Sequence, residues 1–298
     1  MRVFVTGASG FIGLAVTHEL VSSGHEVIGL ARSDKSADAI IKAGATPLRA
    51  SLDDIDSLKK GVDESDGVIN LAFNHDFSQF ATSAQAELKA SETIGQVLKG
   101  TNRPFVIASG GPVIDEKIPF PPDTKTPASL RTASALAALE LSKHNVRSSV
   151  VRLAPSVHDG TRRGFVGTLV DIAQKTGVSG YVGDGSNRWC AVHRLDAAHL
   201  FCLALEKAPA GSILQGVADE GIPVKEIAEK IGGHLDALVV SIPSDKAGEH
   251  FGWLRTVIGA DIPASSIITQ ELLGWKPTHP GLLDDLDHGH FFDIVPVQ

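Results

Sequence analysis

The amino-acid sequence predicts an α/β protein with a doubly wound parallel sheet and a smaller, mostly helical C-terminal lobe. Three observations predict this class. The chain opens on an apolar, β-branched run, residues 3–6, that breaks into glycines and then into a helical pattern. Short extended stretches and helical stretches alternate as far as residue 153, which is typical of a parallel sheet. Beyond residue 155 this rhythm changes to loops and helices.

The alternating region supplies the strands and helices of the sheet in order. The first helix, residues 11–23, ends at Gly24, and the second, residues 34–43, ends at Gly44, because glycine is favoured at helix C-termini. Strand, helix and strand in this order form right-handed parallel units. The expected strands are residues 3–6, 25–32, 46–50, 67–72, 104–109 and 148–153, and the further helices are residues 55–61, 77–98 and 128–144.

The domain boundaries follow from the change of rhythm. Residues 1–155 are expected to form a Rossmann-type domain, to which residues 190–218 return with a sheet-packing helix and two short extended stretches, 191–192 and 212–217. Residues 156–189 and 219–298 are expected to form the substrate lobe. Ligands of such folds bind at the carboxyl ends of the strands, where the lobes would meet.

The first turn has the glycine spacing of a phosphate-binding loop. Gly7 allows the tight turn off the strand, Gly10 lets a pyrophosphate approach the backbone, and Gly13 lets the helix pack closely on the sheet. Backbone N–H groups at the helix start then face the phosphates, and the helix dipole favours their charge. An ordinary strand-to-helix turn is the alternative. The expected cofactor contacts in this loop are Gly7, Ser9, Gly10, Phe11, Ile12 and Gly13.

Composition narrows the choice of partners. A net charge of -8, spread along the chain, argues against a surface for nucleic acid or anionic membrane, which needs a basic stripe. No apolar run is long enough to span a bilayer. The two cysteines, Cys190 and Cys202, show neither metal-ligand spacing nor a disulfide framework, which fits a reducing compartment. We therefore expect a cytoplasmic protein with a small-molecule substrate and no metal.

The end of the second strand indicates which dinucleotide is bound. A carboxylate there would bind the ribose hydroxyls of NAD, but the strand ends at Arg32 and Ser33. A guanidinium suits a 2′-phosphate, so the sequence favours NADP, with Arg32 and Ser33 as contacts. The alternative is that Arg32 is a solvated loop residue and that Asp34 binds the ribose.

Further stretches match motifs of one superfamily: residues 6–13, 70–72, 109, 151–156, 192–198 and 273–277. With them the chain resembles the short-chain dehydrogenases/reductases, in particular the extended and atypical branches related to nucleotide-sugar epimerases and dehydratases. The resemblance covers nearly the full length. It implies that Ala72 lies along the middle of the cofactor and that Ser109 faces the reacting carbon. It also implies that Pro155 contacts the cofactor where a loop closes over nicotinamide and substrate.

The third strand departs from the superfamily pattern. Where an aspartate usually binds the adenine amine, residues 50–53 offer Ser51, with Leu52 beside it and Asp53 as a neighbour. We expect Ser51 and Leu52 to contact the adenine through side chain or backbone.

The second departure concerns the chemistry. Reductases of this superfamily use a tyrosine four residues before a lysine on one helix, and the lysine lowers the pKa of the phenol. When Glu140 is matched to the acidic residue that often follows the lysine, these positions fall on Thr132 and Leu136. The single tyrosine, Tyr181, has Gly185 four residues later and is expected in a loop. The standard proton donor is therefore missing.

Four residues remain as candidate proton donors or orienting groups. His75, next to Asp76, follows the fourth strand, and Ser109 ends the fifth. Tyr181 and His193 lie in a stretch that lines the substrate cavity in extended members. Each also has a structural alternative: a solvated loop pair for His75 and Asp76, a backbone-bonded serine for Ser109, and core packing for Tyr181 and His193.

The sequence thus predicts an NADP(H)-dependent oxidoreductase that reduces a small carbonyl-type substrate with a non-standard proton donor. Two alternatives stay open. One is a non-catalytic NADP-binding sensor or regulatory protein, since the tyrosine and lysine are both lost. The other is a nucleotide-sugar-type epimerase or dehydratase. The helix 128–141 is rich in alanine and leucine, which also permits a homodimer.

Overall fold

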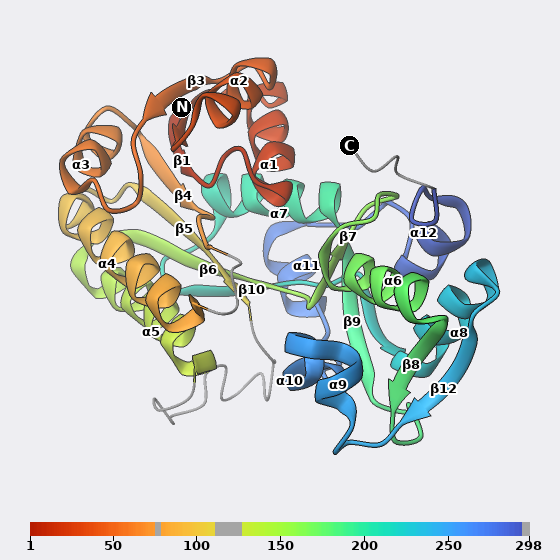
Figure 1. Ribbon diagram of the computed structural model, residues 1–298. Coiled ribbons are helices and arrows are strands. Elements are labelled where there is room, and N and C mark those ends of the chain that lie inside the picture. Colours follow the sequence, from red (N-terminus) through yellow and green to blue (C-terminus); the bar gives the residue numbers. More distant parts are fainter. Residues whose placement is uncertain (75–78, 111–126, 294–298) are drawn as a thin grey trace. The chain divides into compact units, whose positions relative to one another are not determined.

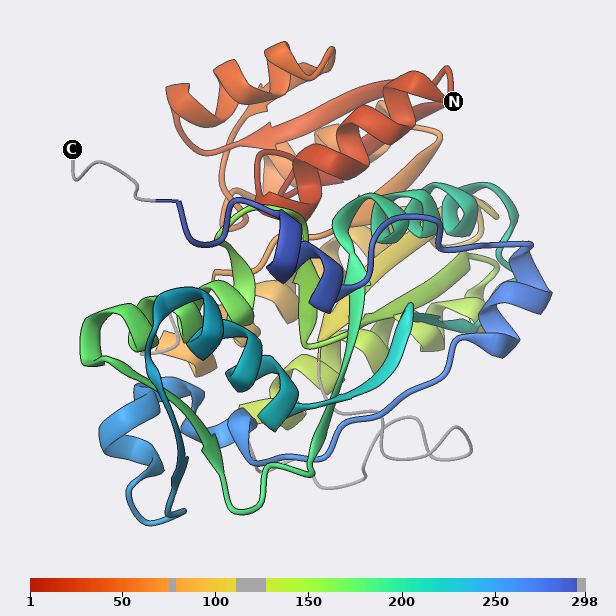
Figure 2. The ribbon, with the colours of Figure 1, turned by 90° about the vertical axis from the view of Figure 1, so that its right-hand side faces the viewer.

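The computed structural model describes residues 1–74, 79–110 and 127–293 (Figures 1 and 2). Its contacts divide the chain into two compact units. The first unit comprises Met1–Arg152, Ala197–Gly216 and Ile267–Lys276, and the second comprises Leu153–Asp196, Val217–Ser266 and Pro277–Gln298. The stretch Ile267–Lys276, which the sequence analysis assigned to the second lobe, thus groups with the first unit.

The first unit is built on a seven-stranded sheet (Figure 1). Its strands are β1 (Arg2–Thr6), β2 (Glu26–Ala31), β3 (Thr46–Arg49), β4 (Gly67–Asn70), β5 (Pro104–Gly110), β6 (Arg147–Leu153) and β10 (Ser212–Gly216). The order is β10-β6-β5-β4-β1-β2-β3, with parallel ladders around β1. The chain runs outward from β1 to β3 and then crosses to β4, so the loops after β1 and β4 diverge, as in ligand-binding doubly wound sheets. The predicted doubly wound sheet is confirmed.

The helices of the first unit follow the strands as expected, with ends that differ by a few residues. Helix α3 packs on α4 and α4 on α5, whereas α1 contacts α2 and, through Glu19 and His199, α7. Two helix starts carry side-chain caps, because Ser33 accepts from the N–H of Ser36 and Asp54 from that of Ser57. The bounds are α1 (Phe11–Ser22), α2 (Asp34–Lys42), α3 (Ile55–Asp63), α4 (Phe80–Leu98), α5 (Pro127–Glu140), η2 (Leu141–His144), α7 (Arg194–Lys207) and α11 (Ile267–Leu273).

One part of the core of the first unit lies between the sheet and the row of helices α3, α4 and α5. Phe4 of β1 and Phe105 of β5 are fully buried there, together with Leu58 of α3 and Ile94 of α4. Gly61 of α3 lies directly on the Phe4 ring, where an added Cβ would come within 2.6 Å of a ring carbon. This contact sets how closely α3 approaches the sheet.

The second unit combines helices with two small sheets, of order β11-β9-β7 and β12-β8. Its elements are β7 (Ser156–His158), α6 (Gly164–Thr176), β8 (Val178–Val182), β9 (Arg188–His193), β11 (Asp219–Pro223), α8 (Val224–Leu235), β12 (Leu238–Ile242), α9 (Ala247–Phe251), η3 (Gly252–Leu254), α10 (Arg255–Ile258) and α12 (Leu282–His288). The core is formed around Trp189, Phe251 and Phe291, which are all buried.

Two local expectations for this part of the chain are wrong. Residues 191–192 were expected to rejoin the main sheet, but β9 pairs instead with β7 and β11. Tyr181 was expected in a loop, but it lies in β8, where it is the register partner of Ser241 in β12. Both corrections come from pairing between strands that are distant in sequence. Within the described residues, the helices are too short or too polar to cross a membrane.

The close approach of α3 to β1 can be tested with Gly61→Ala. The added methyl group must displace the buried Phe4 ring, and such overpacking costs about 1–3 kcal/mol, more than the roughly 1 kcal/mol of helix propensity that alanine gains. We expect a lower midpoint of thermal unfolding by circular dichroism. Gly233→Ala is the matched control, because Gly233 is an exposed glycine of α8 with no atom near its added Cβ. An equal or higher midpoint for both variants would contradict the packing argument.

Candidate functional site

The turn from β1 into α1 has a tightly constrained backbone. Gly7 has φ of +69°, a conformation that favours glycine. A Cβ at Gly13 would lie 1.9 Å from the carbonyl oxygen of Gly7, so any side chain there would push α1 away from the turn. At Gly10, by contrast, an added Cβ would meet only that same oxygen, at 3.2 Å. Gly7 and Gly13 are therefore required by the fold, whereas at Gly10 an added Cβ would make one close contact, with the backbone of the turn.

The start of α1 is suited to a negatively charged ligand. Its N-cap residue, Gly10, is extended and offers no side chain to cap the helix, and the first turn carries no acidic residue. The first N–H groups of a helix have no intrahelical partner, and the helix dipole is positive at this end. The glycine turn therefore has features that a pyrophosphate requires: no side chain at Gly10, backbone donors and a favourable field.

A buried hydrogen-bond network holds the carboxyl ends of β1 and β4 together. The Thr6 hydroxyl donates to Oδ1 of Asn70 (2.5 Å) and accepts from the N–H of Ala72 (3.2 Å). The Asn70 amide donates to Ser91 of α4 (3.0 Å), whose hydroxyl donates to the Glu87 carbonyl (2.9 Å). Thr6 and Asn70 are buried, so this network is shielded from water. It fixes the backbone of Ala72 against Gly7, the first residue of the glycine turn.

Two arginines lie at the ends of the neighbouring strands β2 and β3, and the sequence pointed only to the first of them, Arg32. Arg32 and Ser33 are exposed, and Ser33 caps α2. Arg49, the last residue of β3, is the register partner of Ala31 and lies 2.6 Å from Oδ1 of Asp34. Asp34, the alternative ribose ligand, is therefore engaged by a guanidinium. The register of β3 against β2 brings Arg49 here, and sequence spacing does not reveal that register.

The other expected contacts in the first unit lie at strand ends or just beyond them. Ser51 is exposed and accepts a hydrogen bond from the N–H of Asp53 (3.3 Å), and Leu52 packs on the core. Ser109 is 5% exposed near the end of β5. Asn70 of β4 and Ile107 of β5 are register partners. Ala72 and Ser109 each follow two residues later, so they lie at the same level along the two neighbouring strands. His75 and Asp76 lie outside the described residues.

Helix α5 carries neither of the usual catalytic side chains. Thr132 and Leu136 stand four residues apart on it, and Leu136 is 45% exposed. Tyr181 in the second unit has a different setting, because its half-buried ring packs on the apolar core and the Lys225 ammonium lies 5.9 Å from the ring centroid. No tyrosine and lysine stand four residues apart on a helix of the described chain.

Two buried histidines flank one carboxylate in the second unit. Nδ1 of His158 lies 2.6 Å from Oδ2 of Asp285, and the same oxygen is 3.9 Å from Nε2 of His193. Nδ1 of His193 accepts a hydrogen bond from the N–H of Leu195 (3.2 Å). Burial lowers the pKa of His193, although Asp285 acts in the opposite direction. His193 is therefore neutral at neutral pH, with its proton on Nε2.

His193 also belongs to a cluster with Asp196 and His279. Each of these residues offers an atom of a kind that binds metal ions, and the three atoms lie within 4.8 Å of one another. The rings of His193 and His279 are stacked, with centroids 4.7 Å apart and planes at 6°. A metal ion lies in the plane of each imidazole that binds it, and two parallel stacked planes share no such point. The Asp196 carboxylate instead accepts from the N–H groups of Thr278 (3.0 Å) and His279 (3.1 Å). In this geometry the cluster fixes a loop rather than binding a metal.

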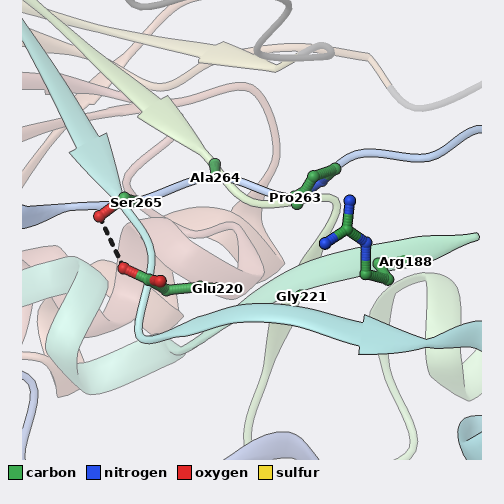
Figure 3. A pocket seen from close by; sticks show the side chains of 6 residues that line it. All are labelled: Arg188, Glu220, Gly221, Pro263, Ala264 and Ser265. Atoms are coloured by element: carbon green, nitrogen blue, oxygen red, sulfur yellow. Dashed lines mark hydrogen bonds between the residues drawn. The ribbon is translucent and has the colours of Figure 1, made fainter.

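A surface hollow of about 380 Å³ in the second unit contains none of the expected site residues (Figure 3). Its lining includes Arg188 and Glu220, at opposite ends of the hollow. The Arg188 guanidinium pairs with Asp261 (2.9 Å), whose pKa it lowers through hydrogen bonding, and Glu220 accepts from the Ser265 hydroxyl (2.6 Å). The charged groups of this hollow are therefore engaged with neighbours.

The structure gathers most of the predicted cofactor residues in the first unit. The glycine turn, Arg32, Ser33, Ser51, Leu52, Ala72 and Ser109 all belong to it, whereas Pro155, Tyr181 and His193 belong to the second unit. Arg49 and the network behind Ala72 escaped sequence reasoning, because both depend on which strands are neighbours. The sequence offered one signal for that network: two polar residues, Thr6 and Asn70, in the apolar strands expected at residues 3–6 and 67–72.

Comparison with known proteins agrees with this architecture. The chain is 46% identical to an uncharacterized protein of Schizosaccharomyces pombe over 98% of this chain and 100% of the relative. It is 28% identical to a 4-hydroxy-2-methyl-3-oxo-4-farnesyl-3,4-dihydroquinoline-1-oxide ketoreductase of Stigmatella aurantiaca, over 93% of this chain and 88% of the relative.

Among solved structures, the fold is similar to that of the UDP-glucose 4-epimerase of Thermus thermophilus in complex with NAD. The TM-score is 0.75 over 99% of this chain and 100% of that chain, at 18% identity. The family model described as NAD dependent epimerase/dehydratase family matches residues 3–215. The chain therefore belongs to the NAD dependent epimerase/dehydratase family.

Proposed function

We propose that this protein is an NADP(H)-dependent oxidoreductase that reduces a small carbonyl-type substrate. The observation that carries the proposal is a helix start with no side-chain cap, at Gly10, between two glycines that the fold itself requires. In this proposal the pyrophosphate lies against Gly10, where no side chain keeps it from the backbone, and the bound nicotinamide supplies the hydride. The first unit then forms the cofactor domain, with Pro155 at the edge of the substrate lobe.

The choice of NADP over NAD rests on charge at the end of β2. Arg32 is exposed and forms no ion pair within the described residues, so its guanidinium is available to a 2′-phosphate. Arg49 is the register partner of Ala31, the residue before Arg32, and its guanidinium pairs with the Asp34 carboxylate, which would otherwise repel such a phosphate. Two guanidiniums beside a carboxylate that is already paired favour the 2′-phosphate of NADP over the ribose hydroxyl of NAD.

Proton delivery to the substrate oxygen is assigned to Ser109 with a water molecule. Ser109 belongs to the same unit as the glycine turn and ends a strand next to β4, at the edge where such sheets bind their ligands. The neutral His193 is a weaker candidate, because its Nδ1 is already used by the Leu195 N–H and its lowered pKa disfavours the imidazolium. Tyr181 remains the second candidate.

The Stigmatella aurantiaca relative supports a reductase, since its name is that of a ketoreductase and the similarity extends over most of both chains. Thr132 and Leu136 on α5 favour a second candidate function, a cofactor-binding sensor without turnover. Titration with NADPH, followed by a panel of aldehydes, ketones, quinones and enones, separates the two. Loss of nicotinamide absorbance supports the reductase, and tight binding without turnover on the whole panel supports the sensor. An epimerase would turn over a sugar nucleotide without net consumption of NADPH.

The Gly10→Ala variant tests the placement of the pyrophosphate. Its methyl group occupies the space assigned to the phosphates, and losing one charge-assisted hydrogen bond costs about 1.5–3 kcal/mol. We expect the Kd for NADPH to rise by roughly tenfold or more. The added Cβ stands 3.2 Å from one atom, the Gly7 carbonyl oxygen, so a small shift of the turn accommodates it and the chain stays folded, which thermal unfolding checks. Gly233→Ala should change neither quantity. Unaltered NADPH affinity in Gly10→Ala would rule this phosphate site out.

The role of the β2 end is tested by Arg32→Ala. Removing a guanidinium that binds a 2′-phosphate should weaken NADPH binding by roughly tenfold to a hundredfold and leave NADH binding unchanged. Lys42→Ala removes one positive charge from the other end of α2 and serves as the control. Fluorescence titrations with both cofactors give the ratio of affinities. If wild type prefers NADH, or if Arg32→Ala and Lys42→Ala behave alike, Arg32 does not select the cofactor.

The proton route is tested by Ser109→Ala, a nearly isosteric change at a buried position. We expect kcat to fall by roughly a hundredfold or more, while the Kd for NADPH stays the same, because the hydroxyl acts on the substrate oxygen. Tyr181→Phe and His193→Gln should keep kcat within a few-fold. A large fall in kcat in one of these two variants, with Ser109→Ala active, would move the proton donor to that residue.

A further inference from the structure

A second group of chemically reactive side chains lies in the first unit, at the end of the strands opposite to the glycine turn. His25 stands in the turn between α1 and β2, directly before the first residue of β2. Cys202 and Glu206 lie on α7, four residues apart, and therefore on one face of that helix. The ligand atoms of these three residues all lie within 4.8 Å of one another.

The contacts inside the group identify which atoms face one another. Nε2 of His25 is 3.0 Å from Oε1 of Glu206. The other ring nitrogen, Nδ1, is 3.4 Å from the nitrogen of Met1, so Nε2 is the nitrogen presented to the group. Sγ of Cys202 is 3.7 Å from the Ser23 hydroxyl, a weak contact that a stronger partner can replace. One imidazole nitrogen, one thiol and one carboxylate thus converge.

This donor set matches the preference of one class of ion. Zn²⁺ and similar divalent ions bind imidazole nitrogen, thiolate and carboxylate oxygen at about 2.0–2.3 Å in tetrahedral sites, which separates the donor atoms by roughly 3–4 Å. The nitrogen and oxygen already stand at that separation. The group contains a single imidazole, so no stacking of two rings prevents a shared ion, unlike the group around His193 and His279.

The surroundings of the group are largely closed to solvent. Cys202 is 3% exposed and the His25 side chain is 7% exposed. An ion bound between them would therefore be shielded from competing water by these two residues.

We propose that His25, Cys202 and Glu206 form a binding site for a divalent transition-metal ion of the Zn²⁺ type, with water as the fourth ligand. On binding, the Cys202 S–H bond breaks, a sulfur–metal bond forms, and the proton passes to solvent, so no oxidation state changes. The site ties the last turns of α7 to the turn between α1 and β2. It is a structural site, and it does not rest on the proposed oxidoreductase function.

The experiment uses the full chain, stripped of metal with a chelator and kept reduced, and titrated with Co²⁺ and then with Zn²⁺. We expect one equivalent of Co²⁺ to give sulfur-to-cobalt charge-transfer absorption in the near ultraviolet and ligand-field bands in the visible. Zn²⁺ should displace it and raise the midpoint of thermal unfolding. Absence of sulfur-to-cobalt absorption in the wild-type chain would overturn the proposal.

Variants assign the ligands. Cys202→Ala should abolish the charge-transfer band, and Glu206→Gln should weaken Zn²⁺ binding by at least about tenfold, the loss that follows removal of even an outer partner of a metal ligand. Glu206→Gln keeps the shape of a partly exposed side chain, so its fold is not at risk. Cys190→Ala and His199→Asn are the matched controls and should bind as wild type does. Metal binding as tight as that of the wild-type chain in both Cys202→Ala and Glu206→Gln would also overturn the proposal.

Discussion

The backbone contact between Gly13 and Gly7 is the constraint on which the rest of the first unit depends. A Cβ at residue 13 would stand 1.9 Å from the Gly7 carbonyl oxygen, so α1 lies directly on the turn that it follows. Residue 7 is also held from the other side, because its Cβ position would be 2.8 Å from the Ala72 nitrogen. The buried Thr6 and Asn70 side chains lock that second contact. Helix, turn and the loop after β4 are thus fixed together.

The first half of the fold could be predicted because its signals are local. Gly24 and Gly44 mark helix ends, Ser33 and Asp54 cap the next helices, and the apolar runs between them are short enough to be strands. The second unit could not be predicted in the same way. Residues 178–182 contain Gly180 and precede Gly183, which suggested a loop, yet they form β8 through pairing with β12, some sixty residues later along the chain. Such non-local pairing leaves little trace in a local pattern.

The same distinction applies to the candidate site. The glycine turn and Arg32 are readable because each depends on neighbours in sequence. The pairing of Arg49 with Asp34 depends on the register of β3, and the neutral state of His193 depends on burial by segments far away in the chain. His25, Cys202 and Glu206 were not read as a group, since a separation of more than 170 residues has no spacing rule and only packing of α7 beside α1 brings them together.

The burial of both cysteines has a consequence for the chemical durability of the chain. In the metal-free chain, burial raises the pKa of Cys190 to about 12 and that of Cys202 to about 11, so both sulfurs are held there as thiols at neutral pH. Peroxides, disulfides and alkylating reagents attack thiolates, and a buried thiol offers them neither the charge nor the access. Both thiols of the metal-free, folded chain are thus shielded from oxidants and electrophiles, and reactivity with a thiol reagent becomes a direct report of local unfolding around α7 or β9.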